Sequence, residues 1–187
     1  HLSQKFVERR KKRFPRRSGT IPVRFSGWIQ QSDSMSRDIF RNLVIGSLKI
    51  TGNVFAAPMA GYTDRVTRAL ALKAGACLAY TEMISSEGLA RRDPRSLSMM
   101  RRAEGELILA VQLFGSSAET LGRAAAIAAE SGADLLDLNA GCPVRKVTSR
   151  GGGAALAKNR NELVHCITEM RKSGLPVTVK MRMGWDQ

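Results

Sequence analysis

The sequence predicts an α/β fold in which a parallel β-sheet alternates with helices, and three observations support this. Short apolar runs, of strand length, recur between longer stretches with helical periodicity. A glycine follows each long predicted helix, at Gly75, Gly132 and Gly174. The run at 107–115 is apolar almost throughout, as is usual for parallel strands buried on both faces. These features predict successive strand–helix–strand units with right-handed crossovers.

The strands are predicted on five apolar runs, at 54–61, 78–83, 107–115, 133–138 and 176–182. The helices between them are predicted at 65–74, 117–131 and 159–172. Thr63 and Asp64 provide an N-cap for the first helix. A small hairpin or edge strand is expected at 43–50, and a loop or short helices around 91–95. The stretch that follows the fourth strand, through Gly153, is expected to be one polar, glycine-rich loop.

Composition indicates one globular domain with a real core, since the chain has 187 residues of which 43% are hydrophobic. No apolar run approaches the ~20 residues of a membrane span, so no membrane partner is expected. The three cysteines are odd in number and show neither CxxC nor Cys/His metal spacing. We therefore expect no metal site and a reducing, cytoplasmic location.

The chain is strongly basic, with a net charge of +14, which favours a polyanionic partner. Residues 1–34 contain nine Lys/Arg and two Asp/Glu, a net charge of +7, so half of the excess lies there. This segment is either a nucleic-acid-binding tail or a disordered extension from an over-long gene prediction, with Met35 as the true start. The second interpretation is favoured, and the folded domain is then 35–187.

Five polar side chains come late in, or just after, the predicted strands. They are Gln112, Asn139, Cys142, Lys180 and Arg182. If the sheet curves into a barrel, these side chains meet at one rim, where parallel α/β folds place their chemistry. Met59 and Met83 would then line the same pocket with polarisable surface.

Such a rim suits a flat, conjugated, electron-accepting ligand. Gln112 can both donate to and accept from the edge of a heterocycle, and Lys180 can stabilise charge that develops on the ring. Cys142, on a mobile loop, could exchange a proton. Taken singly, Gln112 could be a satisfied core amide, Lys180 an ion-paired residue and Cys142 an inert small apolar residue. Taken together, they favour a functional site.

Several blocks of the sequence, in this order and spacing, resemble the tRNA-dihydrouridine synthases, most closely their bacterial B-type (nitrogen-regulation-like) branch. The blocks lie at 57–64, 81–83, 111–113, 138–147 and 179–185. The resemblance covers about residues 36–187 and implies a TIM (β/α)8 barrel with FMN at its C-terminal rim. It implies that the turn of Pro58, Met59 and Ala60 lies against the flavin. Gln112 and Lys180 match the residues that bind the flavin ring.

The resemblance also implies the reaction and its substrate contacts. In this family NADPH reduces FMN, a hydride goes to C6 of a tRNA uridine, and a thiol protonates C5 to give 5,6-dihydrouridine. Cys142 matches that general acid, and Asn139 matches a residue near the target uracil. Arg145 and Lys146 would meet tRNA phosphate. Their loop, which contains cations and glycines but no Walker spacing, could equally be a solvated loop.

The chain length departs from the family pattern, because a TIM barrel takes ~250 residues and eight strands. Residues 35–187 provide about five strand–helix units. We therefore expect an incomplete barrel, from a fragment or truncated gene product. Alone it should have impaired or no activity and should bind FMN weakly or not at all. The alternatives are another FMN-dependent pyrimidine oxidoreductase, similar to dihydroorotate dehydrogenase, and an inactive truncated protein that contacts RNA.

Overall fold

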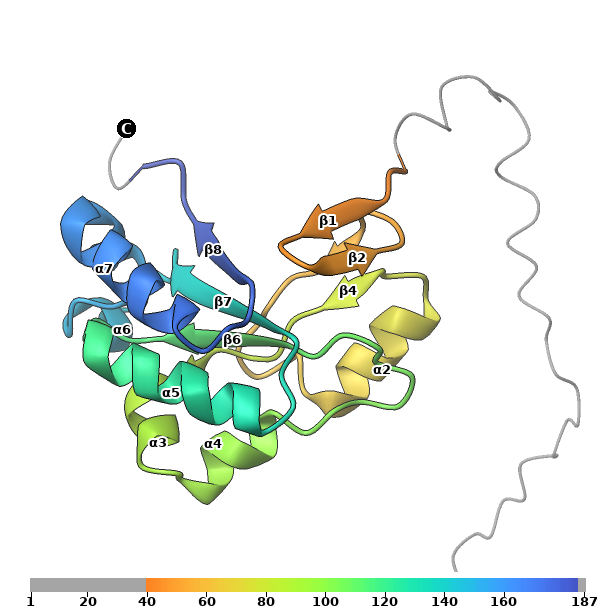
Figure 1. Cartoon of the computed structure of the whole chain (residues 1–187), viewed down its shortest axis with the longest axis horizontal. Coiled ribbons are helices and arrows are strands. Elements are labelled where there is room, and N and C mark those ends of the chain that lie inside the picture. Colours follow the sequence, from red (N-terminus) through yellow and green to blue (C-terminus); the bar gives the residue numbers. More distant parts are fainter. Residues whose placement is uncertain (1–39, 185–187) are drawn as a thin grey trace, which may run out of the picture. The chain divides into compact units, whose positions relative to one another are not determined.

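The computed structural model describes residues 40–184, and a curved parallel β-sheet is its central feature (Figure 1). Four strands pair in the order β5-β6-β7-β8, and β3 pairs in parallel with β4. Their bounds are β3 Phe55–Ala56, β4 Leu78–Ala79, β5 Ile84–Ser85, β6 Ala110–Phe114, β7 Leu135–Ala140 and β8 Val177–Met181. A bridge between Tyr80 and Ala110 joins the two groups of strands. The α/β class and the parallel sheet are therefore confirmed.

The helices begin close to the predicted positions because their N-caps are local signals. Asp64, Ser117 and Asn159 each accept a hydrogen bond from the backbone N–H three residues later. The polar segment after β5 forms two short helices, one of the two predicted alternatives. The helical bounds are α2 Arg65–Lys73, α3 Ser86–Ala90, α4 Pro94–Met99, α5 Ala118–Glu130, α6 Arg145–Thr148, the 3-10 helix η1 Gly153–Lys158 and α7 Arg160–Arg171.

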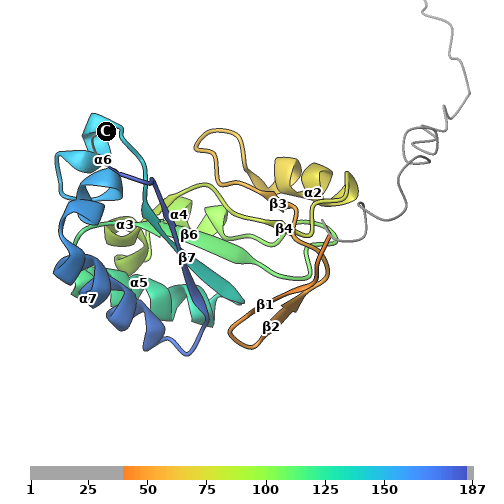
Figure 2. The same ribbon diagram turned by 90° about the horizontal axis from the view of Figure 1, so that it is seen from above.

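The outer face of the sheet carries the main core. Helices α3, α5 and α7 pack along this face (Figure 2), and buried side chains such as Leu113, Leu136 and Leu138 contact them. Each such leucine contributes about 1.5–3 kcal/mol when fully buried. Because strand side chains alternate, Leu135, Asp137 and Asn139 of β7 lie on the opposite, inner face.

A hairpin, one of the two alternatives predicted for 43–50, covers the beginning of the inner face. Strands β1 (Leu43–Ile45) and β2 (Leu48–Ile50) are antiparallel, with Gly46 at a φ of 59° in the turn. Their apolar side chains pack with Leu78, Ala110 and Leu135, which begin three strands of the sheet. The N-terminal ends of these strands are thus covered by apolar side chains.

Three predicted strands are wrong in extent. The strand at 54–61 is limited to β3, because the turn at Pro58 follows it directly. In the other two, side chains bind part of the backbone. The strand at 107–115 begins only at Ala110, and Leu107 is 90% exposed. Arg102 donates to the carbonyl of Leu107, and the Asp134 carboxylate accepts from Leu109 N. Backbone N–H groups at 134–135 reach only the Leu109 carbonyl, so pairing with the β7 segment begins there. Of the strand predicted at 78–83, only β4 forms, followed by the bridge at Tyr80, and β5 begins after Met83. At the break, the Thr81 hydroxyl accepts the N–H of Gln112.

The prediction of one continuous loop through Gly153 is also wrong. Helix α6 and the beginning of η1 lie within that stretch, and Val147 of α6 is buried. The predicted basic extension at 1–34 and the predicted start at Met35 lie outside the described residues. Between residues 40 and 184, no helix has both the length and the apolar character needed to span a membrane.

Candidate active site

The inner face of the sheet carries a row of hydrogen-bonded polar side chains near the C-terminal ends of β6, β7 and β8. In the strand register Gln112 lies beside Asp137, and Asn139 lies beside Lys180. Gln112 Nε2 donates to Asp137 Oδ2 at 2.6 Å, and Asn139 Nδ2 donates to Gln112 Oε1 at 2.9 Å. The structure thus brings Gln112 and Asn139, which are 27 positions apart, into direct contact.

Asn139 also holds the backbone that carries Cys142. Its Oδ1 accepts from the N–H of Cys142 at 2.9 Å and from the N–H of Gly141 at 3.2 Å. On the other side, the Cys142 carbonyl accepts from Ala154 N at 2.9 Å. Arg182 Nε donates to the Gly141 carbonyl at 2.9 Å. Cys142 therefore sits in a turn that side chains and η1 hold, rather than in an open loop, and its side chain is half-buried.

The turn of Pro58, Met59 and Ala60 follows β3 and so lies at the same end of the sheet. The Met59 carbonyl accepts from the N–H groups of Tyr62 and Thr63, both at 3.0 Å. Gly61, the residue after Ala60, donates its backbone N–H to the Glu82 carboxylate. Met59 is 50% exposed, so the turn presents an apolar side chain to the outside.

Met83 connects this turn to the polar row. Its Sδ accepts from Asn139 Nδ2 at 3.7 Å, and it follows Glu82, which binds the turn. The two methionines predicted to line one pocket therefore belong to connected segments.

Lys180, Arg145 and Lys146 provide positive charge at this edge of the sheet. All three side chains are exposed, and Arg145 and Lys146 form the first turn of α6, just after the Cys142 turn. Within the described part of the chain neither Arg145 nor Lys146 forms an ion pair. Lys180 is close enough to Asp137 for its charge to lower the pKa of that carboxyl.

Asp137 is the functional candidate that sequence reasoning missed. It is buried in β7, its Oδ1 accepts from the Thr178 hydroxyl at 2.7 Å, and its Oδ2 accepts from Gln112. Burial raises the pKa of Asp137, and the hydrogen bonds from Gln112 and Thr178 partly oppose this shift. The available signal was a carboxylate between apolar residues of a strand, two residues before Asn139.

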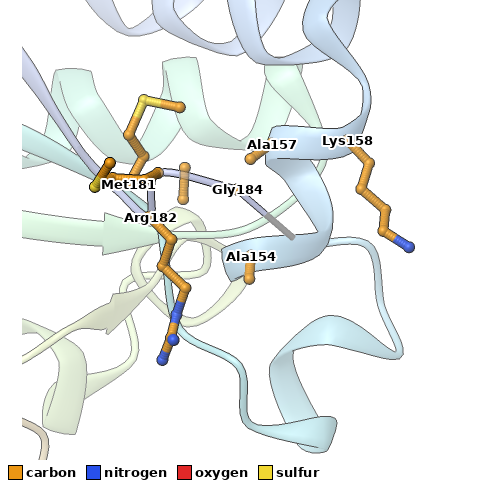
Figure 3. Close-up of a pocket in the computed structure, with 8 residues that line it drawn as sticks. Ala154, Ala157, Lys158, Met181, Arg182 and Gly184 are labelled. Atoms are coloured by element: carbon orange, nitrogen blue, oxygen red, sulfur yellow. The ribbon is translucent and has the colours of Figure 1, made fainter. Parts of the chain in front are cut away.

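A small cavity of about 140 Å³ adjoins the ends of β7 and β8 beside η1 (Figure 3). Ala154 and Ala157 of η1 and Met181 and Arg182 of the β8 end are among the residues that line it. It lies beside the Cys142 turn, because Ala154 and Arg182 both bind that turn.

The arrangement fits a flat heterocyclic ring. Gln112 is buried and uses one N–H and one lone pair within the protein, so these two bonds leave its second N–H and second lone pair unused. Lys180 places a cation nearby, and Met59 and Met83 provide apolar surface. Across residues 40–184 no group of three or more His, Cys, Asp or Glu side chains is placed to hold a metal ion.

Known proteins similar to this chain identify its family. The family model for dihydrouridine synthase (Dus) matches residues 55–187. A probable tRNA-dihydrouridine synthase of Treponema pallidum is 36% identical over 156 residues, which cover 80% of this chain and 46% of that protein. The tRNA-dihydrouridine synthase B of Klebsiella pneumoniae is 37% identical over 143 residues, covering 76% of this chain and 44% of that protein. The chain thus spans somewhat less than half the length of these relatives.

Solved structures show the same fold at low sequence identity. Histamine dehydrogenase from Rhizobium sp. 4-9 has a TM-score of 0.57 and 14% identity, over 81% of this chain and 34% of that one. Morphinone reductase in complex with tetrahydroNAD has a TM-score of 0.51 and 13% identity, over 76% of this chain and 63% of that one. These likenesses concern the fold alone, which is an incomplete TIM barrel. On the family match and the relatives, this chain belongs to the dihydrouridine synthase family.

Proposed function

We propose that residues 35–187 form part of the catalytic domain of an FMN-dependent tRNA-dihydrouridine synthase, with 1–34 as a basic extension. The observation that carries this proposal is the Cys142 turn, which Asn139 holds next to Gln112 on the inner face of the sheet. A thiol fixed beside a site for a flat ring is the arrangement that reduction of an activated C=C bond needs. Three free cysteines suit a reducing, cytoplasmic location.

The cofactor would lie across the polar row. Gln112 and Lys180 would hold the ring edge, and the turn of Pro58, Met59 and Ala60 would cover the ring. FMN, reduced by NADPH, would supply the hydride that adds to C6 of the uracil. The cation of Lys180 would stabilise negative charge on the reduced ring.

The substrate would enter from the Cys142 side. Asn139 would orient the uracil, and the Cys142 thiol would give its proton to C5. Hydride and proton together saturate the C5=C6 bond and give 5,6-dihydrouridine. The target base must leave its stack to reach this position, so Arg145 and Lys146 would contact the tRNA phosphates on either side.

The first experiment is reconstitution of the chain with FMN, followed by assay on undermodified tRNA with NADPH. Cys142→Ala should retain the visible flavin spectrum and lose dihydrouridine formation by at least about a hundredfold, the usual contribution of a general acid. Cys77→Ser is the matched control, because Cys77 packs by the N-terminal hairpin instead of the Cys142 turn, and it should keep activity. Turnover by Cys142→Ala at the rate of an active Cys77→Ser control would refute the proposal.

The choice of substrate separates this proposal from a dihydroorotate-dehydrogenase-like reaction. We expect reduction of uridine within tRNA and none of free orotate or uracil. A colourless protein that binds RNA without flavin would instead favour the non-enzymatic alternative. Because the chain spans less than half of its relatives, the same assays on the Treponema pallidum relative provide the full-length reference.

A further inference from the structure

We propose that Asp137 is a positioning residue that sets the direction of the hydrogen bonds leading from the sheet interior to Cys142. The proposal rests on the proposed function only for its consequence, which is the placement of the thiol. The direction of the hydrogen bonds is a property of the chain itself.

The argument begins with what a carboxylate can do. An ionised carboxylate accepts hydrogen bonds and donates none. Asp137 is buried, and both of its oxygens accept bonds, from Thr178 at 2.7 Å and from Gln112 at 2.6 Å. Burial raises the pKa of Asp137, and the hydrogen bonds from Gln112 and Thr178, with the nearby charge of Lys180, oppose this rise and favour the ionised form. Asp137 therefore requires a donor from each neighbour.

That requirement passes along the row. Gln112 must turn its NH2 group to Asp137, which leaves its Oε1 facing Asn139. Asn139 must then turn its own NH2 group to Gln112 and Met83, which leaves its Oδ1 facing the N–H groups of Gly141 and Cys142. Reversal of either amide would set donor against donor or acceptor against acceptor in a site where both amides are buried.

The end of the row is the turn that carries the proposed proton donor. Two backbone N–H groups bind one amide oxygen, so the turn keeps its geometry only while Asn139 keeps its orientation. Asp137 forms no hydrogen bond with Cys142 or with its turn, so it would act through Gln112 and Asn139. Small errors of position at a reacting group reduce rate strongly, so such a residue matters for a proton transfer.

Backbone hydrogen exchange tests this directly, without flavin or tRNA. In the full chain, the exchange protection of the Gly141 and Cys142 amides is measured relative to that of Leu136 and Leu138 in β7. The ratio removes any global loss of stability. Asp137→Leu should lower this ratio by about tenfold, and Asn139→Ala, which removes the acceptor itself, should lower it at least as much. Asp137→Ala removes the same acceptor without adding bulk and serves if the leucine variant does not fold.

Two further variants separate a positioning role from a merely structural one. Thr178→Val removes the other bond to Asp137 but leaves the row to Cys142 intact, so the ratio should not change. In the Asn139→Ala background, Asp137→Leu should have no additional effect on the ratio, because its route to the turn is gone. An unchanged ratio in Asp137→Leu, or an equal fall in both backgrounds, would overturn the proposal. Neither result depends on the flavin and tRNA assays, so this proposal and the proposed function can be refuted independently.

Discussion

At the scale of single residues, burial decides which of the titratable side chains can react. Cys166, in α7, is fully buried, whereas Cys142, after the end of β7, is half-buried. Among the carboxylates, Asp137 is likewise buried, in β7, where it accepts hydrogen bonds from two side chains. The two buried groups lead to predictions that need only the purified chain.

Alkylation should distinguish the cysteines. Burial, with the nearby Glu162 carboxylate, raises the pKa of Cys166 to about 11, so at pH 8 only about one molecule in a thousand carries the reactive thiolate there. We expect iodoacetamide at pH 8 to label Cys142 in the folded protein and to leave Cys166 unlabelled, as measured by peptide mass spectrometry. Both should be labelled in urea. Early labelling of Cys166 without urea would contradict its burial.

Asp137 should give stability an unusual dependence on pH. Its pKa is raised in the folded state, so the folded chain binds this proton more tightly than the unfolded chain. The stabilisation is complete below the ordinary Asp pKa of about 3.9 and is lost as pH rises through the folded value. The free energy of unfolding in urea, wild type minus Asp137→Asn, should therefore fall as pH rises across this window.

Asp64 provides the control of opposite sign. Hydrogen bonds from the backbone N–H and side chain of Thr67 lower the pKa of this exposed N-cap carboxyl. Its contribution should be present above the unfolded pKa and lost as pH falls. The difference between wild type and Asp64→Asn should thus rise with pH. If the free energy of unfolding of wild type minus that of Asp137→Asn also rose with pH, burial would not be raising the pKa of Asp137.

At the scale of elements, the close approach of η1 to the Cys142 turn is the most sensitive contact. Gly153, at the start of η1, has a φ of 58°, and a Cβ there would lie 2.5 Å from the Cys142 carbonyl oxygen. Gly132, after α5, also has a positive φ, 88°, but a Cβ there meets nothing within 4 Å. Both glycines therefore need a positive φ, but only at Gly153 would an added Cβ also collide with neighbouring backbone.

Alanine substitutions at Gly153 and Gly132 should separate the cost of backbone strain from the cost of the steric clash. Each substitution costs about 1–2 kcal/mol for the left-handed conformation. Gly153→Ala should cost more than Gly132→Ala in urea unfolding, because the Cys142 backbone must also move. Only Gly153→Ala should change the alkylation rate of Cys142. Equal effects of both variants on that rate would show that η1 does not fix the turn.

At the scale of the whole molecule, charge is the property that the family's substrate would use. The chain has a net charge of +14, and α6 places two exposed cations beside the Cys142 turn. Arg171, at the far end of α7, is also exposed. Since parallel strands and their helices run in opposite directions, Arg171 lies at the opposite end of the sheet from Cys142.

Salt dependence of tRNA binding should show which cations contact phosphate. Loss of one phosphate contact lowers the slope of log K against log salt by about one. We expect Arg145→Ala and Lys146→Ala each to lower the slope by this amount, and Arg171→Ala to leave it unchanged. Binding measured by fluorescence anisotropy between low and moderate salt provides the slope. If the slopes for Arg145→Ala and Lys146→Ala equalled that for Arg171→Ala, α6 would not belong to the proposed RNA-binding surface.

The amino-acid sequence by itself determined the class of fold, the helix starts and the hairpin at 43–50, because these depend on interactions between near neighbours. Asp64, Ser117 and Asn159 bind backbone only three residues away, and alternation within β7 follows from strand geometry. The motif around Cys142 and the family followed from short blocks in fixed order.

Only the tertiary structure decided the contacts between residues far apart in the chain. Asp137 binds Gln112 across 25 positions and Thr178 across 41, and this pairing depends on strand register, which no local pattern specifies. The same holds for residues 107–109, where Arg102 and Asp134 bind the backbone, and for the break after Tyr80, where Thr81 binds Gln112. Hydrogen-bond partners are chosen by what folding brings within reach, so the row that leads to Cys142 exists only in the folded sheet.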